Sequence, residues 1–133
     1  MLKKTHQIKN LCYKIRKTIL DVSYNCGEPS HIGGALSIVE IVSVLFSDVM
    51  NLNKENPLWE ERDRFILSKG HACLAYYAAL CEIGHIPKSE LKTFEKNETI
   101  NCFKVDFLEI GDAYIYLVFY VIRPNTFILH WIS

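Results

Sequence analysis

The fold is decided by residues 62–72, which read Arg62-Asp63-Arg64-Phe65-Ile66-Leu67-Ser68-Lys69-Gly70-His71-Ala72. The apolar run Phe65–Leu67, set between charged residues and a glycine, predicts a buried β-strand. The alanine-rich residues from about His71 to Ile83 predict a helix, and Gly84 is placed to end it. A strand that leads through a glycine turn into a helix is typical of α/β folds, in which ligands gather at strand and helix ends. This stretch therefore predicts an α/β fold.

Two further helices are predicted upstream of this stretch. Apolar residues three and four positions apart over residues 8–22 form one helical stripe, and Gly27 is placed to end that helix. Residues 28–36 have the composition of a loop. The loop leads into Ser37-Ile38-Val39-Glu40, which fits a capping box at the start of a helix with an apolar face through Val49.

Downstream, the character of the chain changes near Thr99. A short helix is predicted from Pro87 to about Lys96, with Leu91 and Phe94 as buried contacts. The run Ala113–Ile122 is rich in tyrosine, valine and isoleucine and predicts a strand. Residues 127–132 are again apolar, which indicates a terminus that is either buried in a sheet or prone to aggregate.

Composition excludes several classes of function. The 133 residues carry 15 basic and 15 acidic side chains, so no basic excess favours nucleic acid. The longest apolar run is well short of the roughly 20 residues that span a bilayer, and no signal peptide is recognisable at the N-terminus. The five cysteines include no C-x-x-C pair, so reduced, half-buried thiols are expected. We expect a cytoplasmic protein of one domain, without nucleic-acid or membrane partners.

Two histidines have a setting that favours ligand binding. His31 precedes the pair Gly33 and Gly34, and His71 follows Lys69 and a glycine. Each predicted site lies beside a helix start, where free N–H groups and a partial positive charge suit a phosphate. A loop histidine taken alone is more often a surface or capping residue, so this pattern leaves both interpretations open. No Cys, Asp or Glu accompanies the histidines at metal-ligand spacing, and no metal site is predicted.

The same segments resemble the transketolases. Residues 30–37 with Glu40-Ile41 are similar to the family's S-G-H-x-G-G-x-L-S-x-x-E-I opening, and residues 62–72 are similar to its D-R-F-x-L-S-K-G-H-A block. The likeness covers roughly residues 5–97, and its form is most similar to the N-terminal subunit of split transketolases. It implies an N-terminal fragment of the three-layer α/β/α fold that binds thiamine diphosphate. We expect that fragment to be mostly helical with a rudimentary sheet, because strands are too few for a full parallel one.

The resemblance implies an activity and a site. Transketolases move a two-carbon ketol unit between sugar phosphates with thiamine diphosphate and Mg²⁺ or Ca²⁺. By resemblance, His31 and His71 are catalytic, and His31, Gly33, Gly34, Lys69 and His71 bind the cofactor. It also implies sugar phosphates as substrates. The partners that it implies are a C-terminal transketolase subunit, which is a separate polypeptide, and further copies of the chain in a homo-oligomer.

The sequence departs from the family after about Ile100. The G-H-P block, the glycine-rich segment and the metal-binding G-D-G…N motif have no match, and Gly111-Asp112-Ala113 lacks the second glycine. We therefore divide the chain into a transketolase N-terminal-like segment, 1–99, and an unmatched hydrophobic tail, 100–133, with the metal ligands absent.

Three interpretations remain open at this point. The chain is part of a transketolase, inactive in isolation, or it is a non-catalytic truncated or frameshifted remnant or interaction module. The third is a related thiamine diphosphate enzyme, such as a dihydroxyacetone or 1-deoxyxylulose phosphate synthase, against which the Lys69–Ala72 block favours transketolase.

Overall fold

The computed structural model describes residues 2–26, 32–56, 59–67, 69–93, 118–123 and 126–131, and only the backbone from residue 92 onward. The chain divides into two compact units. The first comprises Met1–Val49 and His71–Phe103, and the second comprises Met50–Gly70 and Lys104–Ser133. The predicted boundary between residues 99 and 100 concerns sequence resemblance and stays a prediction.

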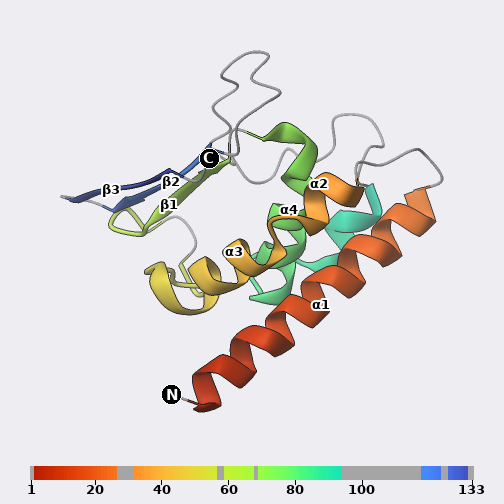
Figure 1. The fold of residues 1–133 in the computed structure, drawn as a ribbon, viewed down its shortest axis with the longest axis horizontal. Helices are drawn as coiled ribbons and strands as arrows, with labels where there is room; N and C mark the ends of the chain where they lie inside the picture. Colours follow the sequence, from red (N-terminus) through yellow and green to blue (C-terminus); the bar gives the residue numbers. More distant parts are fainter. Residues whose placement is uncertain are drawn as a thin grey trace. The chain divides into compact units, whose positions relative to one another are not determined.

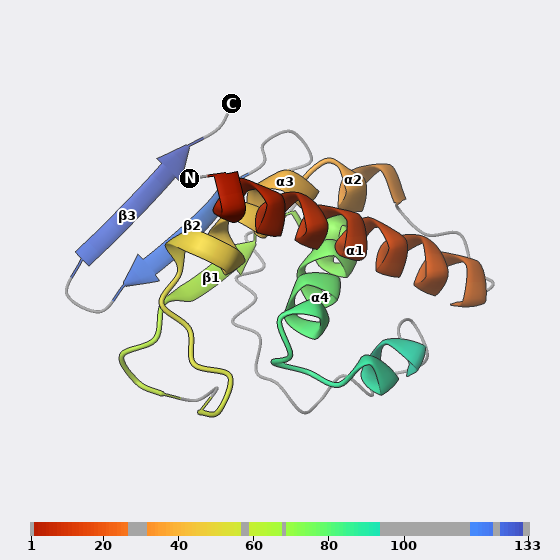
Figure 2. The same ribbon diagram turned by 90° about the horizontal axis from the view of Figure 1, so that it is seen from below.

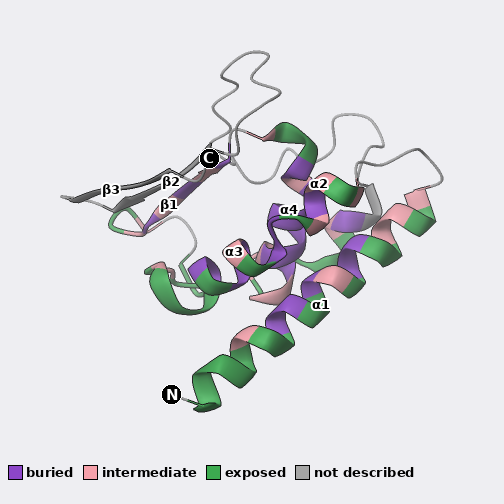
Figure 3. Ribbon diagram, viewed as in Figure 1, coloured by how far each residue is buried: buried purple, intermediate pink, exposed green. Residues whose placement is uncertain are grey.

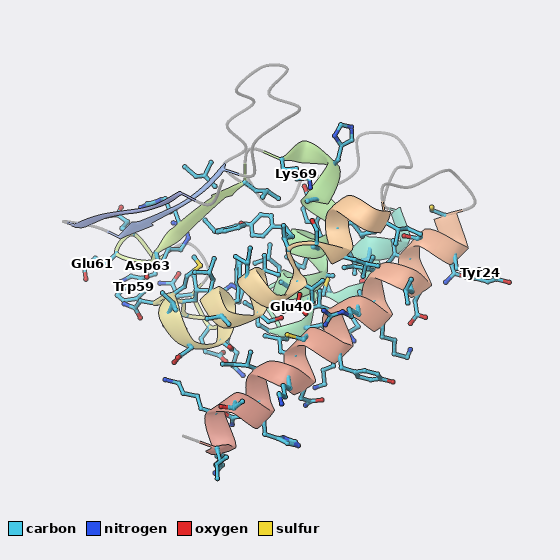
Figure 4. All side chains as sticks on the ribbon, in the orientation of Figure 1. Tyr24, Glu40, Trp59, Glu61, Asp63 and Lys69 are labelled. Atoms are coloured by element: carbon cyan, nitrogen blue, oxygen red, sulfur yellow. The ribbon has the colours of Figure 1, made fainter. Side chains whose placement is uncertain are left out.

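Helix α1, Leu2–Cys26, is the longest element of the first unit. Its predicted stripe is confirmed, because Leu11, Ile15 and Ile19 are buried, the last two completely. That face packs against α3 and α4, and α1 runs across α4 (Figures 1 and 2). The opposite face is exposed along its length (Figure 3). Tyr24, which is 87% exposed, points away from the other helices (Figure 4).

The segment between α1 and α3 corrects two predictions. Residues 32–36, predicted as loop, form the short helix α2, Ile32–Leu36. The capping box is also wrong: the Ser37 hydroxyl donates to the Gly34 carbonyl oxygen at 2.7 Å, and α3 begins without a side-chain cap. Ser37 closes α2, because its N–H donates to the Gly33 carbonyl oxygen at 3.1 Å. A serine hydroxyl bonds the preceding backbone turn readily, and here that local bond replaces the cap.

Glu40, the other predicted member of the box, pairs instead with Arg16 of α1. Figure 4 shows Glu40 on α3, on the side of α1. The Arg16 guanidinium holds the pKa of Glu40 below its ordinary value, although burial opposes this effect. The side chain of Arg16 is 39% exposed and that of Glu40 is 63% exposed, so water screens the pair and its contribution to stability is small.

The predicted helix through Val49 is present but changes form along its length. Helix α3, Val39–Val44, continues as a π-helical turn, η1, Leu45–Val49. Val42, Leu45 and Phe46 are buried as the apolar face predicts, whereas Val49 at its end is exposed. The Phe46 ring lies 5.7 Å from that of Tyr76, centroid to centroid, and so ties this helix to α4.

Helix α4, Cys73–Glu82, forms the centre of the first unit. It follows a 3₁₀ turn, η2, Gly70–Ala72, and its end is confirmed at Gly84, whose φ of 82° is left-handed. Seven of its ten residues are buried, so it is apolar almost all round. The predicted short helix is present as the 3₁₀ segment η3, Lys88–Thr93, with Leu91 buried. Phe94 lies outside the described residues.

The described cysteines Cys12, Cys26, Cys73 and Cys81 are in the reduced form. Cys81 of α4 is 6% exposed. Burial raises the pKa of its thiol to about 11.

The second unit contains a three-stranded sheet in the order β1-β2-β3. Strand β1 is Arg64–Leu67, β2 is Val118–Arg123 and β3 is Thr126–Trp131. Both pairings are antiparallel, and Leu67 pairs with Phe119 in the register of the first two strands.

The strand predictions are confirmed where the structure describes the chain. Strands were predicted at the places of β1 and β2, although residues 113–117 of the second run lie outside the described residues. Of the two outcomes left open for the last apolar stretch, the structure shows pairing in a sheet for residues 127–131, and Ile132 lies outside the described residues. The α/β character is confirmed as mostly helix with a small sheet, while the three-layer arrangement stays a prediction.

A buried carboxylate closes the connection that leads to β1. Asp63 is 1% exposed, and its Oδ2 accepts from the Asn51 N–H at 2.8 Å. The Asp63 N–H donates in turn to the Asn51 carbonyl oxygen at 3.0 Å. This reciprocal pair holds the two ends of residues 51–63 together, and Figure 4 labels Asp63 beside Trp59 and Glu61. Within the described residues, no helix is both long and apolar enough to cross a membrane.

Two neighbouring positions on α1 test which face carries the stability. Ile19 is fully buried and Leu20 is 51% exposed. Ile19→Ala should lower the free energy of unfolding by about 2–5 kcal/mol, because it removes buried methyl groups and leaves a cavity. Leu20→Ala should change it by about 0.5 kcal/mol or less. Urea denaturation followed by circular dichroism measures both, and equal losses would contradict the described packing.

Candidate functional site: the glycine–histidine turns at α2 and α4

The strongest candidate site lies where the chain enters α4. Lys69 and Gly70 follow β1 after one residue, and His71 belongs to the 3₁₀ turn that opens the helix. The His71 side chain is exposed and Lys69 is half-buried. Figure 4 labels Lys69 at this turn. The imidazole is therefore accessible to a ligand, and a cationic side chain lies two residues away in sequence.

The start of α4 is electrostatically suited to an anion. Its N-cap residue, Ala72, makes no side-chain capping bond, and no acidic residue lies in the first turn. The first N–H groups of a helix have no partner within the helix, and they carry about half a positive charge. A phosphate oxygen placed there accepts hydrogen bonds from these backbone N–H groups, to which the N-cap residue offers no side-chain acceptor.

The predicted glycines lie on α2, which packs against α4. Gly33 is exposed, and no described atom lies within 4 Å of the place where a Cβ on Gly33 would stand. The same is true of Gly70. Packing among the described residues therefore does not require glycine at either position, and both leave room for a ligand to approach the backbone.

The structure brings together only part of the predicted site. The helix that carries Gly33 and Gly34 contacts the helix that His71 precedes. His31 lies outside the described residues, so its approach to His71 stays a prediction. Of the described residues, no three His, Cys, Asp or Glu side chains form a group that could hold a metal ion. Gly111–Ala113, the echo of the family's metal motif, also lie outside the described part of the chain.

Sequence reasoning missed a second polar cluster in the first unit. Glu82, the last residue of α4, has a side chain that is only 5% exposed. Its Oε1 accepts from the Thr18 hydroxyl of α1 at 2.7 Å and from the Lys88 ammonium of η3 at 2.6 Å. Burial acts to raise the pKa of Glu82, but these two donors outweigh it and the pKa lies below its ordinary value. The only signal in the sequence was a single acidic residue at the end of an apolar helix.

The glycine–histidine turn that leads into α4 is an arrangement that suits a phosphorylated ligand. The model of the family described as transketolase, thiamine diphosphate binding domain, matches residues 9–102. The chain belongs to this family, in its thiamine diphosphate-binding domain.

Curated relatives agree with that assignment. A 6-deoxy-6-sulfo-D-fructose transketolase subunit of Clostridium sp. (strain MSTE9) is 42% identical over 86 residues, which are 65% of this chain and 31% of the relative. An apulose-4-phosphate transketolase subunit of Actinobacillus succinogenes is 36% identical, covering 64% of this chain and 31% of the relative. Transketolase 1 of Escherichia coli is 35% identical over 66% of this chain and 13% of the relative. The matched part thus spans about a third of the first two relatives and about an eighth of the E. coli protein.

The buried carboxylate makes stability depend on pH. Because the folded pKa of Glu82 is lowered, its contribution is fully present above the ordinary glutamate pKa of about 4.3 and is lost as pH falls through the folded value. The free energy of unfolding should therefore decrease from about pH 5 downward, and Glu82→Gln should reduce that dependence. Urea denaturation at several pH values measures it. An unchanged acid-side slope in Glu82→Gln would show that this carboxylate is not held ionised by its partners.

Proposed function

We propose that the chain supplies the N-terminal part of a thiamine diphosphate-dependent transketolase, which moves a two-carbon ketol unit between sugar phosphates. The observation that carries the proposal is the uncapped start of α4, preceded by Lys69 and His71 within the stretch that matches the family. The N-terminal end of α4 carries a partial positive charge, and the first turn of this helix contains no acidic residue. This charge suits the diphosphate of the cofactor.

The residues of the two turns take distinct roles in this proposal. Lys69 supplies a fixed cation for the diphosphate, and His71 donates to a phosphate oxygen or a substrate hydroxyl. Gly33 and Gly34 let the backbone of α2 come close to the cofactor, supported by the open space beside Gly33. By the family resemblance, His31 takes the role of moving a proton to or from a substrate hydroxyl. Bound thiamine diphosphate supplies the electron sink that the ketol carbon needs.

A second polypeptide completes the site in this proposal. Two of the relatives are described as transketolase subunits, and the chain matches about a third of each. We infer that a C-terminal transketolase subunit supplies the remaining contacts to the cofactor and that the assembly is a homo-oligomer of such pairs. In this proposal, Mg²⁺ or Ca²⁺ binds together with the diphosphate, and its protein ligands are residues outside the two turns.

Energetics indicate that the 133 residues alone are not catalytic. A helix end contributes about 0.3–1 kcal/mol to anion binding, and a hydrogen bond to a charged group about 1.5–3 kcal/mol. Lys69, His71 and the start of α4 thus account for a weak diphosphate site at best. Without a metal and a second polypeptide, the cofactor's pyrimidine ring is not held in place.

The diphosphate site is tested by binding. We expect thiamine diphosphate and inorganic pyrophosphate to bind the chain weakly, at millimolar concentration, in an NMR titration, and thiamine itself not to bind. Lys69→Ala and His71→Ala should each weaken pyrophosphate binding about tenfold through loss of a charge-assisted hydrogen bond. Lys9→Ala, on the exposed face of α1, is the matched control and should leave it unchanged. Equal binding by all four proteins would exclude this turn as the anion site.

The absence of catalysis is tested separately. The purified chain, given thiamine diphosphate, Mg²⁺, a ketose phosphate donor and an aldose phosphate acceptor, should form no transfer product above the protein-free rate. Product analysis by mass spectrometry measures this. Ketol transfer by the chain alone would contradict the proposed need for a second polypeptide, while leaving the cofactor assignment in place.

A further inference from the structure

A cavity of about 730 Å³ lies between the C-terminal half of α1, the end of α4 and η3. All of its lining residues belong to the first unit, and Figure 2 shows the three elements side by side. The volume is within the range of about 300–1,000 Å³ that is typical of small-molecule sites. Helix α4 rises about 1.5 Å per residue, so its ten residues put Glu82 roughly 14 Å along the axis from Cys73. The cavity is therefore separate from the turn that carries His71.

The cavity contains a carboxylate with one unused oxygen. The side chain of Glu82 is 5% exposed, and both of its donors, Thr18 and Lys88, bond Oε1. Among the described residues, none donates a hydrogen bond to Oε2. Oε2 therefore keeps its acceptor capacity for an N–H group of a ligand in the cavity.

Helix ends add to the preference for a positive group near Glu82. The last turns of α1 and α4 both contribute to the lining, and neither contains a basic residue. The C-terminal end of a helix carries about half a negative charge, which favours a cation. At α4 this effect is reduced, because backbone N–H groups already bond the Ala79, Leu80 and Cys81 carbonyl oxygens. An ammonium group satisfies this preference and can also donate to Glu82 Oε2.

One of the lysines that line the cavity can pair with a negative group of a ligand. Lys17 is paired with Asp21 at 2.7 Å, and Lys88 is paired with Glu82. Lys14 lines the same cavity without an ion-pair partner among the described residues. Lys14 and Glu82 both line the cavity. Burial acts to raise the pKa of Glu82, and the positive charge of Lys14 acts in the opposite direction, more weakly than Lys88. The cavity thus offers an acceptor and a cation to one ligand.

We propose that this cavity binds a small zwitterion, a free α-amino acid, with its ammonium on Glu82 Oε2 and its carboxylate on Lys14. Val22 and Leu91 supply apolar lining for an aliphatic side chain. The site is independent of the cofactor, because it shares no residue with the turns at α2 and α4.

The ligand chemistry is tested with three matched probes on the full chain. L-Leucine carries both charges, 3-methylbutylamine lacks the carboxylate and 4-methylpentanoate lacks the ammonium. Saturation-transfer NMR should detect binding of L-leucine. Each analogue should bind at least about tenfold more weakly than L-leucine, because each lacks one charge-assisted hydrogen bond. No binding of L-leucine, or equal binding of either analogue, would overturn the proposal.

Two variants locate the site. Lys14→Gln should weaken L-leucine about tenfold and leave 3-methylbutylamine unchanged, and Lys9→Gln, on the exposed face of the same helix, should change neither. Glu82→Gln should weaken both L-leucine and the amine, with circular dichroism to confirm that this variant folds. If it does not fold, the probe series and Lys14→Gln still decide the question. L-Leucine binding that is indifferent to Lys14→Gln would place the ligand elsewhere and refute the assignment.

Discussion

Helix α1 buries one face against α3 and α4, and the rest of the first unit depends on that contact. Ile15 and Ile19 are fully buried at its centre, and they meet a helix, α4, that is apolar almost all round. Three of the buried residues in α4, Ala75, Ala78 and Ala79, have small side chains, which let helices approach closely. The apolar surface removed from water here is the main source of stability for a unit of this size. Helix α2, which carries Gly33 and Gly34, and the start of α4 both belong to elements that pack in this contact.

The periodicity of apolar residues was sufficient to predict the long helix but not the short elements. The stripe over residues 8–22 predicts α1 because three- and four-residue spacing defines one face over many turns. The prediction around Ser37 failed because α2 is only one turn long and its glycines resemble a loop by composition. The hydroxyl of Ser37 then had two backbone partners within reach, and the preceding turn prevailed over the following helix. Glu40 was free to pair with α1, a contact that no local rule predicts.

Some features of the candidate site could also be predicted from the sequence, and others could not. His71 and Lys69 could be singled out from sequence because strand, glycine turn and helix follow one another within a few residues. The missing cap on α4 could not, since it depends on the backbone conformation at Ala72. The cluster at Glu82 was invisible to sequence reasoning because Thr18 lies 64 residues away, and only the crossing of α1 over the end of α4 brings them together. His31 is outside the described residues, so the meeting of the two histidines stays a prediction.

The thiol of Cys81 has a consequence for how this chain responds to oxidants. Because burial raises the pKa of this thiol to about 11, the thiolate, which is the nucleophilic form, is scarce at neutral pH. Peroxide and alkylating reagents should therefore react slowly with the Cys81 thiol while α4 is packed. Covalent labelling of the Cys81 sulfur therefore requires local unfolding of α4, and the labelling rate measures how often this part of the core opens.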